Sequence, residues 1–124
     1  DAVNNAQTEE NFTARSSDDP LAIQDPKMHW NWNAGYLFVK LEGMFDNDGD
    51  GTPETGFEYH VGKNEMLRNI SLTTSKEIMG DDIELMIHVD YGKFFDGIDL
   101  KATPTVHGMD AVLLDNVQGS FMIM

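Results

Sequence analysis

The sequence contains no cysteine, no long hydrophobic run and few basic residues. Without cysteine there are no disulfides, thiolate metal ligands or cysteine nucleophiles, so a soft metal ion would have to be bound by histidine and methionine. No apolar run approaches the about 18 residues of a membrane-spanning helix, so we expect no membrane span. The chain has 8 basic and 22 acidic residues and a formal net charge of −14. This charge argues against binding to nucleic acid and favours cations as partners.

The length and the distribution of polar residues predict one folded domain behind a polar segment. A chain of 124 residues is long enough to bury a single core. Residues 1–27 are rich in polar side chains and follow neither a helical nor a strand period. We therefore expect an extended arm or loop at 1–27 and a folded domain at 28–124.

Alternation of apolar and polar residues predicts strands within residues 28–124. In residues 56–62, Phe57, Tyr59 and Val61 alternate with polar residues, which is typical of a strand with one solvated face. Further strands are predicted at 36–42, 69–73, 83–90 and 120–123, and short helical segments at 91–95 and 110–117. Because loops join the strands, we expect an all-β fold, an antiparallel β-sandwich with long loops and one or two short helical turns.

An acidic loop between the first two predicted strands has the spacing of a calcium-binding loop. Asp46, Asp48 and Asp50 alternate and Gly51 follows them, so the carboxylates can surround a hard cation. An EF-hand is not predicted, because neither flank has a helical pattern. A solvated acidic turn without metal is the alternative. The candidate calcium ligands are Asp46, Asp48, Asp50, Thr52, Glu54 and Glu58.

Two histidines lie beside methionines, in segments that we predict to be loops. The segments are Met28-His29 and His107-Gly108-Met109. Imidazole and thioether together suit copper, and Cu(I) in particular. The alternative is that each histidine makes one structural hydrogen bond. The other two histidines are expected on polar strand faces, in structural roles: His60 and His88.

Both tryptophans of the chain, Trp30 and Trp32, precede the first predicted strand. At positions i and i+2 of an extended segment, the two side chains would point to the same side. One interpretation is that they anchor the core of the sandwich. The other is that they stack on sugar rings together with Tyr36. The sequence has no GxSxG motif, no phosphate-binding loop and no cysteine, so we expect a protein that is not an enzyme.

The segment around the tryptophans resembles the signature of MbnP-like proteins, the family named for a partner of methanobactin copper-acquisition systems. The signature is M-x-W-x-W-x-x-G-Y-x-F-x-K-x-E-G, and residues 28–43 read M-H-W-N-W-N-A-G-Y-L-F-V-K-L-E-G. The resemblance covers about residues 25–124 and includes three later segments in the same order. These are F-E-Y-H-V-G at 57–62, V-D-Y-G-K-F-F-D-G at 89–97 and T-V-H-G-M at 105–109.

The resemblance implies a periplasmic, secreted or cell-surface β-sandwich protein. Copper-binding relatives use histidine and a tryptophan that has been oxidised to kynurenine, and a di-haem peroxidase-like partner performs this oxidation. Carried over to this sequence, the two tryptophans are the candidates for modification, the two loop histidines are the candidate ligands and the adjacent methionines are auxiliary soft ligands. The candidate copper-site residues are therefore Trp30, Trp32, His29, His107, Met28 and Met109.

The resemblance also concerns the extent of the domain. The family normally has several strands before the tryptophan segment, so we expect residues 28–124 to be the C-terminal part of a longer domain. An N-terminal segment or another chain would then complete the sheet. The leading hypothesis is a non-enzymatic extracytoplasmic protein that captures copper and hands it over. The alternatives are a calcium-stabilised carbohydrate-binding or cell-surface interaction module, and a structural subunit of an extracellular assembly.

Overall fold

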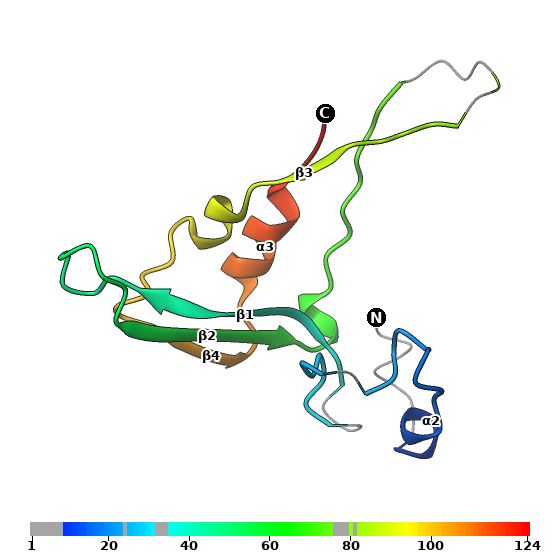
Figure 1. Ribbon diagram of the computed structural model, residues 1–124, viewed down its shortest axis with the longest axis horizontal. Helices are drawn as coiled ribbons and strands as arrows, with labels where there is room; N and C mark the ends of the chain where they lie inside the picture. Colours follow the sequence, from blue (N-terminus) through cyan, green and yellow to red (C-terminus); the bar gives the residue numbers. More distant parts are fainter. Residues whose placement is uncertain (1–8, 24, 32–34, 76–79, 81) are drawn as a thin grey trace. The chain divides into compact units, whose positions relative to one another are not determined.

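A computed structural model describes residues 9–23, 25–31, 35–75, 80 and 82–124 (Figure 1). Its internal contacts divide the chain into two compact units. The first unit comprises Asp1–Leu67 and Asp99–Asp110, and the second comprises Arg68–Ile98 and Ala111–Met124. Each unit contains its own small β-sheet.

The first unit contains a three-stranded sheet with the strand order β1-β2-β4. Strands β1 (Leu37–Phe45) and β2 (Thr55–Gly62) are antiparallel and are joined by the acidic loop, whereas β4 (Thr105–Gly108) pairs with β2 in parallel (Figure 1). The alternation of β2 directs Tyr59 and Val61 to one face, where both side chains are fully buried. Among its described residues, this unit also contains the helix α2 (Glu9–Thr13) and the 3₁₀ turn η1 (Asn64–Met66).

The second unit combines a two-stranded antiparallel sheet with two helical segments. Strand β3 (Ile87–Val89) pairs with β5 (Phe121–Ile123), and helix α3 (Ala111–Gly119) contacts the 3₁₀ turn η2 (Tyr91–Phe95). The Nδ2 atom of Asn116 donates to two carbonyl oxygens at and just after the end of η2, at 3.0 and 2.8 Å. These bonds satisfy carbonyl groups that the end of a helical turn leaves free. Among the residues of this unit that the structure describes, the buried apolar side chains are Phe94, Leu113 and Leu114.

The predicted all-β class, with long loops and short helical turns, is confirmed. Most of the predicted elements are present, with ends that differ by a few residues. The predictions at 36–42, 56–62 and 120–123 correspond to β1, β2 and β5, and those at 91–95 and 110–117 correspond to η2 and α3. The polar residues 1–27 include the short helix α2, which the sequence pattern does not predict.

Three predictions about strands are wrong. Residues 69–73, all of which the structure describes, lie outside the strands. The alternating segment 83–90 is a strand only at Ile87–Val89, where β5 supplies paired residues. His107, which we predicted to lie in a loop, lies in β4, and β4 is parallel to β2 rather than antiparallel. In each case, whether a segment forms a strand depends on the presence of a neighbouring strand to pair with. The alternation of residues within one segment does not reveal whether such a neighbour exists.

Candidate metal centre

One polar face of the three-stranded sheet brings two histidines and two carboxylates together. The register pairs Glu42 with Glu58 and Lys40 with His60 across β1 and β2. It also pairs His60 with His107 across β2 and β4. Directly paired residues of neighbouring strands project to the same face of a sheet. Charged and imidazole side chains from three strands therefore converge on this face.

The side chains of Glu58, His60 and His107 form a cluster that fits a metal ion, and we call it the His–Glu cluster. Each residue offers one ligand atom, and these atoms all lie within 4.8 Å of one another. The two imidazole rings are stacked, with centroids 4.7 Å apart and planes 4° from parallel. Nε2 of His107 lies 2.9 Å from Oε1 of Glu58. The His60 side chain is 15% exposed and that of His107 is 49% exposed, so the cluster opens to solvent on the β4 side.

Glu42 on β1 holds His60 in place. Nε2 of His60 lies 2.7 Å from Oε1 of Glu42, and Nζ of Lys40 lies 3.3 Å from the same oxygen. Two hydrogen bonds lower the pKa of Glu42 below its ordinary value, and the bond with His60 has a larger effect than the bond with Lys40. When Nε2 of His60 donates this bond, the Nδ1 atom keeps its lone pair. Metal-binding histidines commonly have such a carboxylate partner, which fixes the tautomer and the ring orientation.

The donor set of the His–Glu cluster is two imidazole nitrogens and one carboxylate oxygen, without sulfur. Imidazole is a borderline ligand and carboxylate a hard one, so this set suits divalent ions such as Cu(II) and Zn(II) better than Cu(I). Because three protein ligands leave a coordination position for water or another molecule, the cluster has the composition of an open site rather than of a closed structural one.

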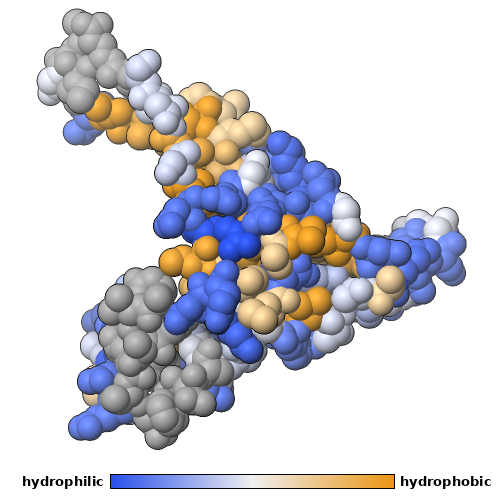
Figure 2. Space-filling view, turned by 180° about the vertical axis from the view of Figure 1, so that it is seen from behind, coloured by the Kyte–Doolittle hydropathy of each residue, from blue (hydrophilic) through white to orange (hydrophobic). Residues whose placement is uncertain are grey.

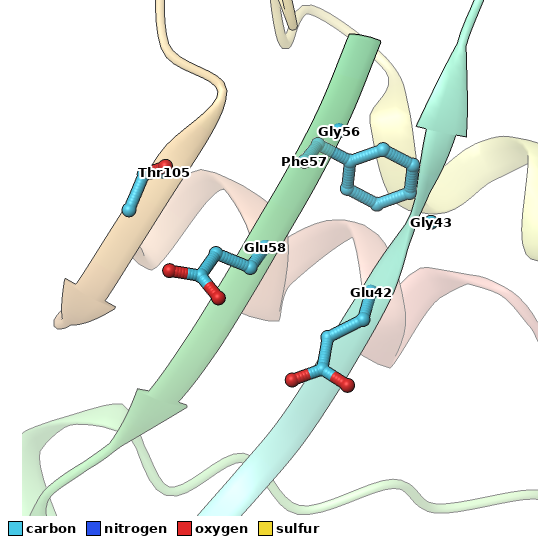
Figure 3. A pocket seen from close by; sticks show the side chains of 6 residues that line it. All are labelled: Glu42, Gly43, Gly56, Phe57, Glu58 and Thr105. Carbon is cyan, nitrogen blue, oxygen red and sulfur yellow. The ribbon is translucent and has the colours of Figure 1, made fainter. Parts of the chain in front are cut away.

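Beside the cluster, the same strands surround an open depression of about 320 Å³ (Figure 3). In Figure 3 the carboxylates of Glu42 and Glu58 point to the same side of the sheet, and the ring of Phe57 reaches across Gly43. A Cβ atom on Gly43 would lie 2.8 Å from Cε1 of Phe57, so glycine leaves the space that the ring occupies. The depression gives small ions and solvent access to the carboxylates. Its lining residues are Glu42, Gly43, Gly56, Phe57, Glu58 and Thr105.

The acidic loop brings three of the expected calcium ligands together. One oxygen atom each of Asp46, Asp48 and Glu54 lies within 4.8 Å of the others. The carboxylate of Asp46 accepts the backbone N–H groups of Gly51 and Gly49, at 2.7 and 2.6 Å. These bonds lower the pKa of Asp46 below its ordinary value. The loop is therefore closed by hydrogen bonds of its own, with the carboxylate cluster on its exposed surface.

The other expected calcium ligands lie outside this group. Asp50 accepts the backbone N–H of Thr52 at 2.7 Å, as in an ordinary Asx turn. Glu58 lies in β2, where it contacts His107 instead of the loop. The sequence spacing thus locates the acidic cluster, but it assigns Glu58 to the calcium loop while the sheet register assigns it to the His–Glu cluster.

The segment before β1 folds back on itself. His29 and Tyr36 form an isolated antiparallel bridge, and burial lowers the pKa of His29 below its ordinary value. The ring of Trp30 lies against Gly62 at the end of β2, where a Cβ atom would be 3.2 Å from its Cζ3 atom. This contact supports the interpretation of Trp30 as an anchor of the fold. Trp32 lies outside the described residues.

The structure places the expected copper ligands in different surroundings. His107 belongs to the His–Glu cluster, whereas His29 is in no group of three or more converging histidine and acidic side chains among the described residues. Met28 and His29 line a separate cavity of about 220 Å³, and the side chain of Met109, just beyond β4, is exposed. Sequence reasoning missed His60 as a partner of His107. The alternation in 56–62 places His60 on a polar face, but only the register of β2 with β4 reveals the second imidazole.

A β-rich fold with a histidine–carboxylate cluster on an exposed sheet face defines a candidate metal-binding protein. The sequence model of the MbnP family, described as MbnP, matches residues 2–109, and the chain belongs to this family. The predicted family resemblance is confirmed, and the match includes every residue of the His–Glu cluster. No curated protein and no solved structure matches the chain. Within the residues that the structure describes, no helix has the length and hydrophobicity needed to cross a membrane.

Proposed function

We propose that this protein is a non-enzymatic, extracytoplasmic metal-binding protein that captures copper and hands it over to a partner. The observation that carries the proposal is the convergence of Glu58, His60 and His107 on one open sheet face, with ligand atoms within 4.8 Å. Membership of the MbnP family supports a role in association with methanobactin systems. The net charge of −14 supports attraction of cations from solution.

The unequal exposure of the two histidines suits capture and release better than permanent storage. His60 is largely covered and is held by Glu42, so it provides a fixed ligand. His107 is half exposed on the edge strand β4, and its Nε2 atom lies 2.9 Å from Oε1 of Glu58 on β2, so a partner molecule has access to its ring. An incoming ligand can replace an exposed imidazole without unfolding the sheet. We infer that copper enters and leaves on the His107 side.

The test is a copper titration of metal-free protein by competition with a chelator of known affinity. We expect one copper ion per chain, and His60→Ala or His107→Ala should each lower the affinity by more than the about 10–100-fold typical of an outer-shell partner. His88→Ala is the matched control, because His88 is an exposed strand histidine of the second unit. The proposal is refuted when His60→Ala and His107→Ala bind copper as tightly as His88→Ala.

A second part of the proposal concerns the tryptophans. Family membership supports oxidation of Trp30 or Trp32 to kynurenine by a di-haem peroxidase-like partner. The side chain of Trp30 is half-buried against Gly62, so part of its ring is accessible to such a partner. Intact mass spectrometry of protein from its native source tests this, because kynurenine formation exchanges one carbon for one oxygen in the net formula. Unmodified mass together with absence of copper binding would contradict both parts.

The acidic loop is proposed to bind calcium in a structural role. The grouped oxygen atoms of Asp46, Asp48 and Glu54 support this, because hard carboxylate oxygens are the ligands that calcium prefers. The ion would relieve the mutual repulsion of these carboxylates and stiffen the connection between β1 and β2. Such an ion would support the sheet that carries the His–Glu cluster, and it would take no part in copper exchange.

A further inference from the structure

One face of the β3-β5 sheet carries three methionines and a histidine. The register pairs His88 on β3 with Met122 on β5. The backbone N–H of Met124 also donates to the carbonyl oxygen of Met86 at 3.0 Å, so the pairing continues one residue beyond both strands. Alternate residues of a strand, and residues paired across two strands, project to the same face of a sheet. The four side chains of this face, which we call the methionine face, are Met86, His88, Met122 and Met124.

The methionine face is open to solvent. Met86, Met122 and Met124 are 59%, 42% and 78% exposed, and His88 is exposed as well. The opposite face of the sheet includes the half-buried side chains of Val89, Phe121 and Ile123. Figure 2 shows hydrophobic residues gathered along the segment that leads into β3, at the upper left. Because the solvated face of an antiparallel sheet is normally polar, three thioethers on this face need an explanation other than core packing.

Sulfur distinguishes the methionine face from an ordinary apolar surface. Strands favour β-branched and aromatic residues, whereas methionine brings a soft, polarisable sulfur on a flexible side chain. The chain places three of its eight methionines on this face, beside an imidazole. Thioether ligands select Cu(I), and imidazole also suits copper. The chain has no cysteine, so no thiolate of its own competes for such an ion.

The strand geometry allows all four side chains to reach one ion. Directly paired residues of an antiparallel ladder have Cα atoms about 4.5–5.5 Å apart. Alternate residues along one strand are about 6.5–7 Å apart. The four Cα atoms therefore outline a small rectangle, with His88 at one corner opposite Met122. The three rotatable bonds of each methionine allow its sulfur to turn toward the centre of this rectangle.

We propose that the methionine face is a Cu(I) site, separate from the His–Glu cluster. The cluster offers imidazole and carboxylate without sulfur, which suits Cu(II), whereas the methionine face offers mainly sulfur, which suits Cu(I). The proposal does not depend on the cluster, because the cluster belongs to the first unit and the methionine face to the second. Thioethers bind Cu(II) weakly, so a Cu(II) titration still gives one ion per chain and His88→Ala remains its control.

The test is a titration with Cu(I), kept reduced by ascorbate in the absence of oxygen, in competition with a Cu(I)-specific chelator. Methionine-to-leucine variants remove the sulfur but keep the volume and hydrophobicity, so they separate a metal site from a merely apolar surface. The Cu(I) affinity should fall at least about 10-fold in each of Met86→Leu, Met122→Leu, Met124→Leu and His88→Ala, because losing a ligand costs no less than losing an outer-shell partner. The matched control is Met44→Leu on β1, since Met44 and Met86 are both 59% exposed. Affinities equal to that of Met44→Leu in all four variants would overturn the proposal.

Nuclear magnetic resonance of isotope-labelled methionine ε-methyl groups provides the second measurement. One equivalent of Cu(I) should shift the methyl signals of three of the eight methionines, which are assigned by their loss in the leucine variants. His107→Ala should leave these shifts unchanged, because His107 belongs to the His–Glu cluster. Shifts confined to Met28 and Met109 would overturn the proposal, since Cu(I) would then bind where methionine adjoins histidine in the sequence. Loss of the three shifts in His107→Ala would overturn the separation of the two sites.

Discussion

Gly62 at the end of β2 offers the most specific test of the fold around the tryptophan segment. Its Cβ position would lie 2.6 Å from the carbonyl oxygen of Tyr36, 3.2 Å from Cζ3 of Trp30 and 3.4 Å from Cα of Leu37. The shortest of these contacts is to backbone, so no side-chain rotation relieves it. Overpacking of this kind costs about 1–3 kcal/mol, and we expect Gly62→Ala to lower the free energy of unfolding by about 2 kcal/mol.

Urea denaturation, followed by circular dichroism and tryptophan fluorescence, measures this loss. The matched control is Gly56→Ala in the same strand, where the nearest atom to a Cβ is the carbonyl oxygen of Gly43 at 4.0 Å. We expect Gly56→Ala to be as stable as the unmodified chain or slightly more stable, since alanine restricts the unfolded state. Gly62→Ala should also change the emission of Trp30, whose ring must move. Equal stability of the two variants would refute the packing of Trp30 and Tyr36 over Gly62.

Three further predictions concern single side chains. Glu42→Ala should lower copper affinity about 10–100-fold by releasing His60, and unchanged affinity in the competition titration would show that Glu42 does not position it. The pKa of His29 lies below its ordinary 6.5, so the unfolded chain binds the proton first and the free energy of unfolding should fall as pH drops below about 6.5. His29→Gln should remove that slope in urea denaturation at several pH values, and a persistent slope would contradict the assignment. Calorimetric titration should show calcium binding that Asp46→Asn weakens, and no heat at millimolar calcium would exclude the site.

The elements of the fold that depend on local pattern were accessible from the sequence. The alternation in 56–62 predicts β2, and the apolar positions in 110–117 predict α3. Elements that depend on a partner distant in the chain could not be predicted from the sequence. Strand β4 has only four residues, and its parallel pairing with β2 joins segments that are far apart in the chain. The alternation of 83–90 predicts a longer strand than β3, because a sequence shows the capacity to pair but not the availability of a partner.

In the candidate site, too, local features were predictable from the sequence and contacts between distant segments were not. The acidic loop was predicted from spacing because its residues lie within one connection, and the oxygen atoms of Asp46, Asp48 and Glu54 do converge. His107 was selected for its neighbouring methionine, whereas its structural neighbours are His60 and Glu58. These three residues come from two strands, and their proximity follows from the register alone. A short segment of sequence therefore identifies a candidate ligand without identifying the ligands beside it.

Pulsed electron paramagnetic resonance of the Cu(II)-loaded protein tests the His–Glu cluster most directly, because it detects the nitrogen atoms of coordinated imidazoles. Two coordinated imidazoles are predicted in the unmodified chain and in His88→Ala, and one in each of His60→Ala and His107→Ala. The same two-imidazole signal in His60→Ala and His107→Ala would contradict the assignment of copper to this cluster.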